Sequence, residues 1–157
     1  MTNKKYLITT AIQQTWQMNT PVLFLGEWCK RYSAKEIWQN LDHETVEYHW
    51  DNREKLYKDY CYLNELYENT LKTLTSSLNE YHGTNYSLQY WRIILGPWLG
   101  QFIEILFDRW QMIDKAVSEF NIIGTTILKM DDHIMVPHNM SGFMDKCSGD
   151  EWNHYIY

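Results

Sequence analysis

The chain has 157 residues, enough for one domain with a sizeable core. Its formal net charge is −6 and its basic residues are scattered singly or in pairs, a distribution that argues against a nucleic-acid-binding surface. No segment approaches the ~20 apolar residues of a membrane span, and the N-terminus lacks the apolar run of a signal peptide. The three cysteines are widely spaced, as in a reducing compartment, so a cytoplasmic protein is expected.

Two short apolar runs at the start of the chain are predicted to be strands. Residues 6–12 are rich in strand-forming side chains, and residues 21–26 form a second run bounded by proline and glycine. Ser33, with Glu36 three residues later, has the spacing of a capping box, so a short helix is expected over residues 34–40. Residues 47–50 are predicted to be briefly extended.

The strongest periodic signal predicts a helix over residues 52–81. Apolar and aromatic side chains recur there every three or four residues and share one stripe, made of Leu56, Tyr60, Leu63, Tyr67, Leu71, Leu74 and Leu78. Asp51, with Glu54 three residues later, is predicted to cap this helix at its N-terminus, and Gly83 to end it.

The region from Ser87 to Phe120 is also helical in pattern, but Gly96-Pro97 lies inside it. Because proline has no backbone N–H and disfavours helix at the residue before it, we expect a helix, a break and a second helix from Pro97 to about Phe120. Strand character returns over residues 124–130, and a last helix is expected to begin near Ser148.

Strands separated by helices predict a helix-rich α/β protein, with residues 1–157 forming one Rossmann-like, three-layer domain. The order of elements resembles the N-terminal half of a two-domain (GT-B-like) glycosyltransferase, and many other doubly wound folds as well. The sequence has no glycine-rich phosphate fingerprint, P-loop, Gly-x-Ser-x-Gly or Cys-x-x-Cys motif. Its histidines are not spaced as metal ligands, so neither a metal nor a covalently bound cofactor is predicted.

Residues 26–29 follow the second predicted strand, where ligands bind in open α/β sheets. Glu27 there has the chemistry of a base or of a ligand for sugar hydroxyls, and Trp28 that of a stacking platform. The alternative is a helix-capping acid beside a core tryptophan, and the sequence does not separate the two interpretations.

Residues 48–53 place a histidine, a carboxylate and a guanidinium at a predicted helix N-terminus. His49 near Asp51 has the composition of a general base with an orienting acid, and Arg53 could bind phosphate. Asp51 is favoured as a helix cap, while His49 is left open between catalysis and structure. Arg92, shortly before Gly96-Pro97, is a further candidate ligand for an anion, with simple packing as the alternative.

Five segments resemble motifs of a group of transferases encoded in O-antigen and other bacterial surface-carbohydrate loci: residues 23–29, 48–55, 90–99, 107–110 and 150–154. The resemblance covers the whole chain in order, and members of the group are several times longer. It implies that this chain is the N-terminal, acceptor-side part of a glycosyltransferase-like enzyme and is inactive alone. The expected partners are a carbohydrate acceptor, a nucleotide-activated donor and a C-terminal domain.

Within such an enzyme, His49 or Glu27 would act as base on the acceptor hydroxyl. Arg53 and Arg92 would bind a phosphate or a carboxylated sugar, and Trp28 would stack on a sugar ring. One alternative is a polyol-phosphate transferase that uses a donor such as CDP-glycerol. The other is a non-catalytic α/β binding module.

Overall fold

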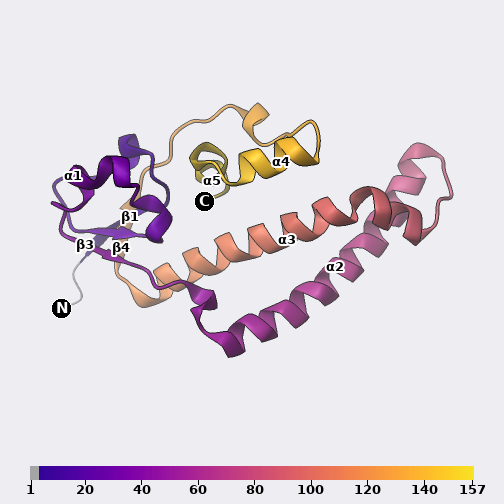
Figure 1. Ribbon diagram of the computed structural model, residues 1–157, viewed down its shortest axis with the longest axis horizontal. Coiled ribbons are helices and arrows are strands. Elements are labelled where there is room, and N and C mark those ends of the chain that lie inside the picture. The colour runs from indigo at the N-terminus through magenta and orange to yellow at the C-terminus, as the bar shows by residue number, and fades with distance from the viewer. Residues whose placement is uncertain (1–3) are drawn as a thin grey trace. The chain divides into compact units, whose positions relative to one another are not determined.

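A computed structural model describes residues 4–157 (Figure 1). The chain divides into two compact units. One unit contains the residues up to His49 together with Arg109–Tyr157, and the other is Trp50–Asp108. Each unit has its own architecture, and the hydrophobic core cluster lies in the first.

The first unit is built on a four-stranded parallel sheet with the strand order β3-β2-β1-β4. Its strands are β1 (Lys5–Ile8), β2 (Val22–Phe24), β3 (His43–Thr45) and β4 (Ile122–Thr125). Val22, Leu23 and Phe24 are all fully buried. Because successive strand residues point to opposite faces, both faces of β2 are covered, as is usual in parallel α/β sheets. The prediction of an α/β protein rich in helix is confirmed.

Short helices and turns surround this sheet. They are η1 (Gln13–Thr15), η2 (Glu27–Cys29), η3 (Tyr32–Ala34), α1 (Lys35–Trp38), η4 (His49–Asp51), η5 (Asp132–Ile134), α4 (Met140–Cys147) and α5 (Asp150–Ile156), where η marks a 3-10 helix. The core joins the strand side chains to Ile37 and Trp38 of α1, and to Met112 and Ala116 near the end of α3 (Leu88–Glu119).

The second unit is a hairpin of two helices, α2 (Arg53–His82) and the first two-thirds of α3. Gly83 ends α2 in the left-handed conformation with φ 62°, and the N–H groups of Gly83 and Thr84 return to the carbonyls of Glu80 and Asn79 in a Schellman motif. The predicted helix is confirmed, and its stripe is buried at Leu63 and Leu71.

The side chain of Asn79 organises the connection between these two helices. Its amide oxygen accepts hydrogen bonds from the hydroxyl of Thr84, the N–H of Tyr86 and the indole N–H of Trp91, each at 3.0 Å. Its amide nitrogen donates to the carbonyl of Tyr86 at 2.9 Å. One side chain therefore satisfies the backbone of the turn and a buried tryptophan together.

The predicted break at Gly96-Pro97 is wrong, because α3 continues through both residues. Proline removes the helical donor for the carbonyl of Ile93, but Ile93 is 68% exposed, so water can serve that carbonyl. Gly96 has no β-carbon to collide with the proline ring, which relieves part of the usual clash. Tyr67 of α2 packs against Gly96 and supports the helix at this point.

The predicted capping by Asp51 is also wrong. Asp51 belongs to η4, and the side chain of Asn52 accepts from the N–H of Lys55 at 3.0 Å as the N-cap of α2. The same 3-10 turn replaces the second half of the extended segment expected at residues 47–50.

The remaining differences concern the sheet and the C-terminal helices. β1 ends at Ile8, four residues earlier than predicted, and β4 lies at residues 122–125 in place of 124–130. β3 was not predicted because its three residues, His-Glu-Thr, show no apolar pattern. The helix α4, capped by Asn139, was also not predicted. Among the helices of residues 4–157, none combines the length and the apolar character needed to cross a bilayer.

Candidate functional site

The topology of the sheet marks one position as favourable for a ligand. The chain runs from β1 to β2 and β3 on one side, and β4 then pairs with the other side of β1. In open parallel sheets such a change of direction leaves a crevice outside the carboxyl ends of the strands. The residues at this point are Thr9, Thr10 and Ala11, which directly follow β1.

The loops after β1 and β2 are tied together at this edge. The indole N–H of Trp28 donates to the carbonyl of Thr9 at 3.0 Å, and the thiol of Cys29 donates to the carbonyl of Ile8 at 3.4 Å. A β-carbon built on Gly26 would lie 2.1 Å from the Trp28 ring. Glycine is therefore needed at position 26 for the indole to lie against the backbone.

The N-terminal part of α5 reaches the same edge. The carboxylate of Asp150 accepts a hydrogen bond from the N–H of Ala11 at 3.3 Å and forms an ion pair with Arg31. Arg109 donates through Nε to the amide oxygen of Asn153 at 2.7 Å. Asn153 is itself fixed, because its amide nitrogen donates to the carbonyls of Cys147 and Gly149.

These groups enclose a cavity of about 160 Å³, which is lined by Trp28, Arg31, Arg109, Ser148, Asp150, Asn153 and Tyr157. Cavities that hold a whole small molecule usually measure about 300–1,000 Å³, so this one suits a single chemical group. The lining contains two arginines and one aspartate. Guanidinium groups bind phosphate and carboxylate through bidentate hydrogen bonds. The two arginines beside one aspartate suit an anionic group of a larger ligand, which would compete with Asp150 for Arg31.

Three of the six predicted site residues belong to this unit. Trp28 lines the cavity, as the position after β2 suggested. Glu27 is exposed and pairs with Lys30 at 2.8 Å. His49 is only 4% exposed, and its ring contacts Tyr48 with 5.1 Å between centroids. Of the three, only Trp28 lies among the lining residues.

The other three belong to the helical hairpin. Asp51 and Arg53 are exposed at the start of α2. Arg92 donates two hydrogen bonds to the carboxylate of Glu68, at 2.6 and 2.7 Å, and its guanidinium lies over the ring of Tyr67. An anionic ligand would have to displace Glu68 before it could bind Arg92.

The comparisons with known proteins decide the family. A family model described as "LIC12162 family transferase" matches residues 5–157, almost the whole chain. The chain belongs to this family. The expectation of a transferase is thereby confirmed at the level of the family. None of the curated proteins and none of the solved structures matches the chain.

The sheet edge also contains a thiol, that of Cys29, which is fully buried. Burial raises the pKa of the Cys29 thiol to about 12, so the thiol stays protonated and is a poor nucleophile. Within residues 4–157, no three His, Cys, Asp or Glu side chains gather in a way that would hold a metal ion.

Sequence reasoning missed Arg31, Arg109, Asp150 and Asn153 as candidates. A signal was present for three of them, because Arg109, Asp150 and Asn153 lie in the segments 107–110 and 150–154 that carried the resemblance to transferases. Periodicity and local motifs could not reveal their meeting, since the chain separates Arg109 from Asn153 by 44 residues and Ala11 from Asp150 by 139.

Proposed function

We propose that the protein is the acceptor-side part of a glycosyltransferase-like enzyme in bacterial surface-polysaccharide or O-antigen biosynthesis. In this proposal a GT-B-like partner domain supplies the site for a nucleotide-activated donor, and the reaction takes place in the cytoplasm. The cavity at the ends of β1 and β2 then holds an anionic group of the substrate between Arg31 and Arg109.

The observation that carries the proposal is the convergence of separate segments at one edge of the sheet. The loop after β2, the residue Arg109 on α3 and the start of α5 all contribute to a single small cavity. A parallel sheet commonly places its ligand at this edge, and the family is one of transferases.

The chemistry requires removal of a proton from an acceptor hydroxyl. The oxygen then forms a bond to the anomeric carbon of the donor sugar as the bond to the nucleotide diphosphate breaks, and the diphosphate leaves with the electron pair. Glu27 and His49 are the two candidates for the base. Glu27 is open to solvent beside Trp28, whereas the burial of His49 favours a structural role for it.

A donor screen tests the proposal. The protein expressed from its own gene is incubated with UDP-glucose, GDP-mannose, dTDP-rhamnose and CDP-glycerol, and nucleotide release is measured. Release from a nucleotide sugar supports the proposal. Release from CDP-glycerol alone supports the alternative of a polyol-phosphate transferase. Arg31 and Arg109 of the cavity would also suit the phosphate of such a substrate. A folded protein that releases no nucleotide from any donor favours the non-catalytic module.

Single substitutions test whether the transferase activity depends on the cavity. Arg109→Gln removes a charge-assisted contact to the anionic group, so kcat/KM should fall by about 10- to 100-fold. Lys58→Gln, an exposed position on α2, is the matched control and should change nothing. Glu27→Gln and His49→Gln, each assayed per folded molecule, identify the base, because only its loss lowers turnover by about 10²–10⁴.

A further inference from the structure

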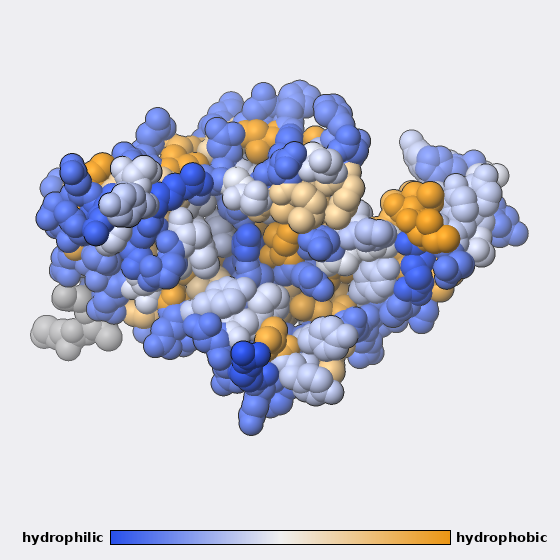
Figure 2. Space-filling view, in the orientation of Figure 1, coloured by the Kyte–Doolittle hydropathy of each residue, from blue (hydrophilic) through white to orange (hydrophobic). Residues whose placement is uncertain are grey.

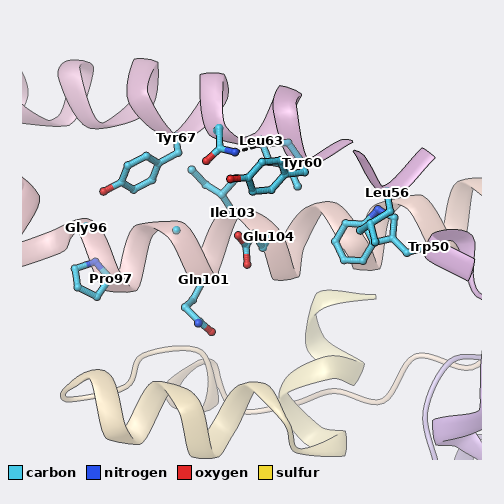
Figure 3. Close-up of a pocket in the computed structure, with 12 residues that line it drawn as sticks. Trp50, Leu56, Tyr60, Leu63, Tyr67, Gly96, Pro97, Gln101, Ile103 and Glu104 are labelled. Atoms are coloured by element: carbon cyan, nitrogen blue, oxygen red, sulfur yellow. Dashed lines mark hydrogen bonds between the residues drawn. The ribbon is translucent and has the colours of Figure 1, made fainter. Parts of the chain in front are cut away.

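The α2–α3 hairpin contains a second and larger hollow. It has a volume of about 470 Å³ and is lined by residues of the second unit alone: Trp50, Leu56, Tyr60, Leu63, Asn64, Tyr67, Gly96, Pro97, Gly100, Gln101, Ile103 and Glu104. This volume lies in the range typical of sites for whole small molecules. In Figure 3, Tyr67 extends from α2 towards Gly96 of α3, and Tyr60 on the same helix lies nearer to Glu104.

A glycine of α3, Gly96, helps to form this hollow because it has no side chain. A β-carbon on Gly96 would lie 2.6 Å from the hydroxyl of Tyr67, and one on Gly100 would lie 3.9 Å from the same ring. Gly96 therefore lets Tyr67 lie close against α3, whereas a β-carbon on Gly100 would make only an ordinary contact with the ring. Tyr60, about two turns further towards the start of α2, lies on the stripe expected to be core and is nevertheless 59% exposed.

The lining combines aromatic rings with hydrogen-bonding groups. The aromatic rings are Trp50, Tyr60 and Tyr67. The amide nitrogen of Asn64 donates to the carbonyl of Tyr60 at 2.9 Å, which turns its amide oxygen into an available acceptor. The carboxylate of Glu104 is a further acceptor on the facing helix.

The charge of the residues that line the hollow disfavours some classes of ligand. Glu104 is the charged member of the lining, and its carboxylate disfavours phosphates and nucleotides. A cationic ligand would compete with the Arg92 guanidinium, which already lies 5.7 Å from the centre of the Tyr67 ring. The surface of the hairpin carries further apolar side chains, Ile93 and Ile94 among them (Figure 2).

We propose that this hollow binds a neutral saccharide unit. The exposed ring of Tyr60 offers a flat face for the C–H face of a sugar ring, and the amide oxygen of Asn64 with the carboxylate of Glu104 accepts hydrogen bonds from its hydroxyls. The inference depends on the hairpin alone and not on the function proposed for the sheet edge. Its test therefore needs binding data only, and its failure would leave that function untouched.

Saturation-transfer difference NMR on the 157-residue chain tests the proposal, with glucose, N-acetylglucosamine, glucose 6-phosphate and choline as probes. A neutral monosaccharide should bind with a Kd on the order of millimolar, as small ligands do, and glucose 6-phosphate should bind more weakly than glucose. Tyr60→Ala and Glu104→Ala should each weaken binding by about tenfold. Because both side chains are exposed, neither change should unfold the hairpin.

The controls lie on the same helix outside the hollow. Tyr57→Ala removes an exposed tyrosine and Glu65→Ala an exposed carboxylate, and both should bind sugar like the parent chain. The proposal is overturned if neither neutral sugar binds at about 50 mM, or if choline or glucose 6-phosphate binds more tightly than glucose. It is equally overturned if Tyr57→Ala weakens binding as much as Tyr60→Ala does.

Discussion

The indole N–H of Trp28 donates to the backbone carbonyl of Thr9 at 3.0 Å, and this bond joins the loop after β2 to the loop after β1. Trp28 lines the candidate cavity, so its position affects the shape of that cavity. Its ring in turn depends on Gly26, where no side chain stands in its way.

Gly26→Ala should therefore disturb both stability and the cavity. The added methyl group would overlap the Trp28 ring, which must move and give up its bond to Thr9. Overpacking of this kind costs about 1–3 kcal/mol, measurable by urea unfolding. Gly142→Ala is the control, because its β-carbon would make only ordinary contacts in α4. Equal stability of Gly26→Ala and the parent chain would show that Trp28 can be repositioned without cost.

Asn79→Ala should weaken the hairpin connection. The change removes four hydrogen bonds and leaves the indole N–H of Trp91, which is 8% exposed, without this acceptor. At about 0.5–1.5 kcal/mol for each bond, the free energy of unfolding should fall by about 2–6 kcal/mol, as measured by urea unfolding. Asn69→Ala, exposed on the same helix, should change it by less than about 0.5 kcal/mol. Similar losses in the two variants would contradict the role of Asn79.

The Glu68–Arg92 pair predicts a dependence of stability on acid pH. The hydrogen bonds from Arg92 hold the pKa of the Glu68 carboxyl below its ordinary value. As pH falls, the unfolded chain therefore takes up a proton on Glu68 before the folded protein does. The stability that the Glu68–Arg92 pair contributes is present above the ordinary pKa of 4.5 and is lost as pH falls through the lower pKa of the folded protein. Urea midpoints of Glu68→Gln should fall less between about pH 6 and pH 3 than those of the parent chain.

Glu65→Gln, an exposed neighbour on α2, provides the comparison for that measurement and should keep the acid dependence of the parent chain. An unchanged acid dependence in Glu68→Gln would mean that the ion pair does not persist in solution.

His154 predicts a second pH dependence, closer to neutrality. Burial lowers the pKa of His154 below its ordinary value of 6.5, and Nε2 accepts a hydrogen bond from the N–H of Leu128 at 2.9 Å. The folded protein therefore keeps this ring neutral while the unfolded chain takes up a proton. Stability should fall as pH drops from about 7 to about 5.

Thermal unfolding at several pH values measures this effect. His154→Gln retains an acceptor for Leu128 but cannot titrate, so its melting temperature should vary less over that range. His133→Gln replaces an exposed histidine and should behave like the parent chain. If His154→Gln loses stability on acidification as steeply as the parent chain, another group is responsible.

The sequence determined the features that depend on local physics. The periodic stripe from Leu56 to Leu78 defined α2 because a helix repeats every 3.6 residues, and Gly83 ended it because glycine adopts positive φ without strain. The apolar run before Gly26 indicated a buried parallel strand. Trp28, which was proposed from its position after that run, lines the cavity at the sheet edge, and its role in stacking on a sugar stays a prediction. The α/β class followed from the same patterns.

Only the tertiary structure decided the features that depend on partners distant in the chain. α3 continues through Pro97, with Tyr67 packed against the neighbouring Gly96, and β3 pairs with the edge of β2. The meeting of Arg109 with Asn153, and of Ala11 with Asp150, follows from the folding of separate segments onto one sheet edge. Periodicity records only neighbours a few residues apart, so contacts across such distances leave no periodic signal in the sequence.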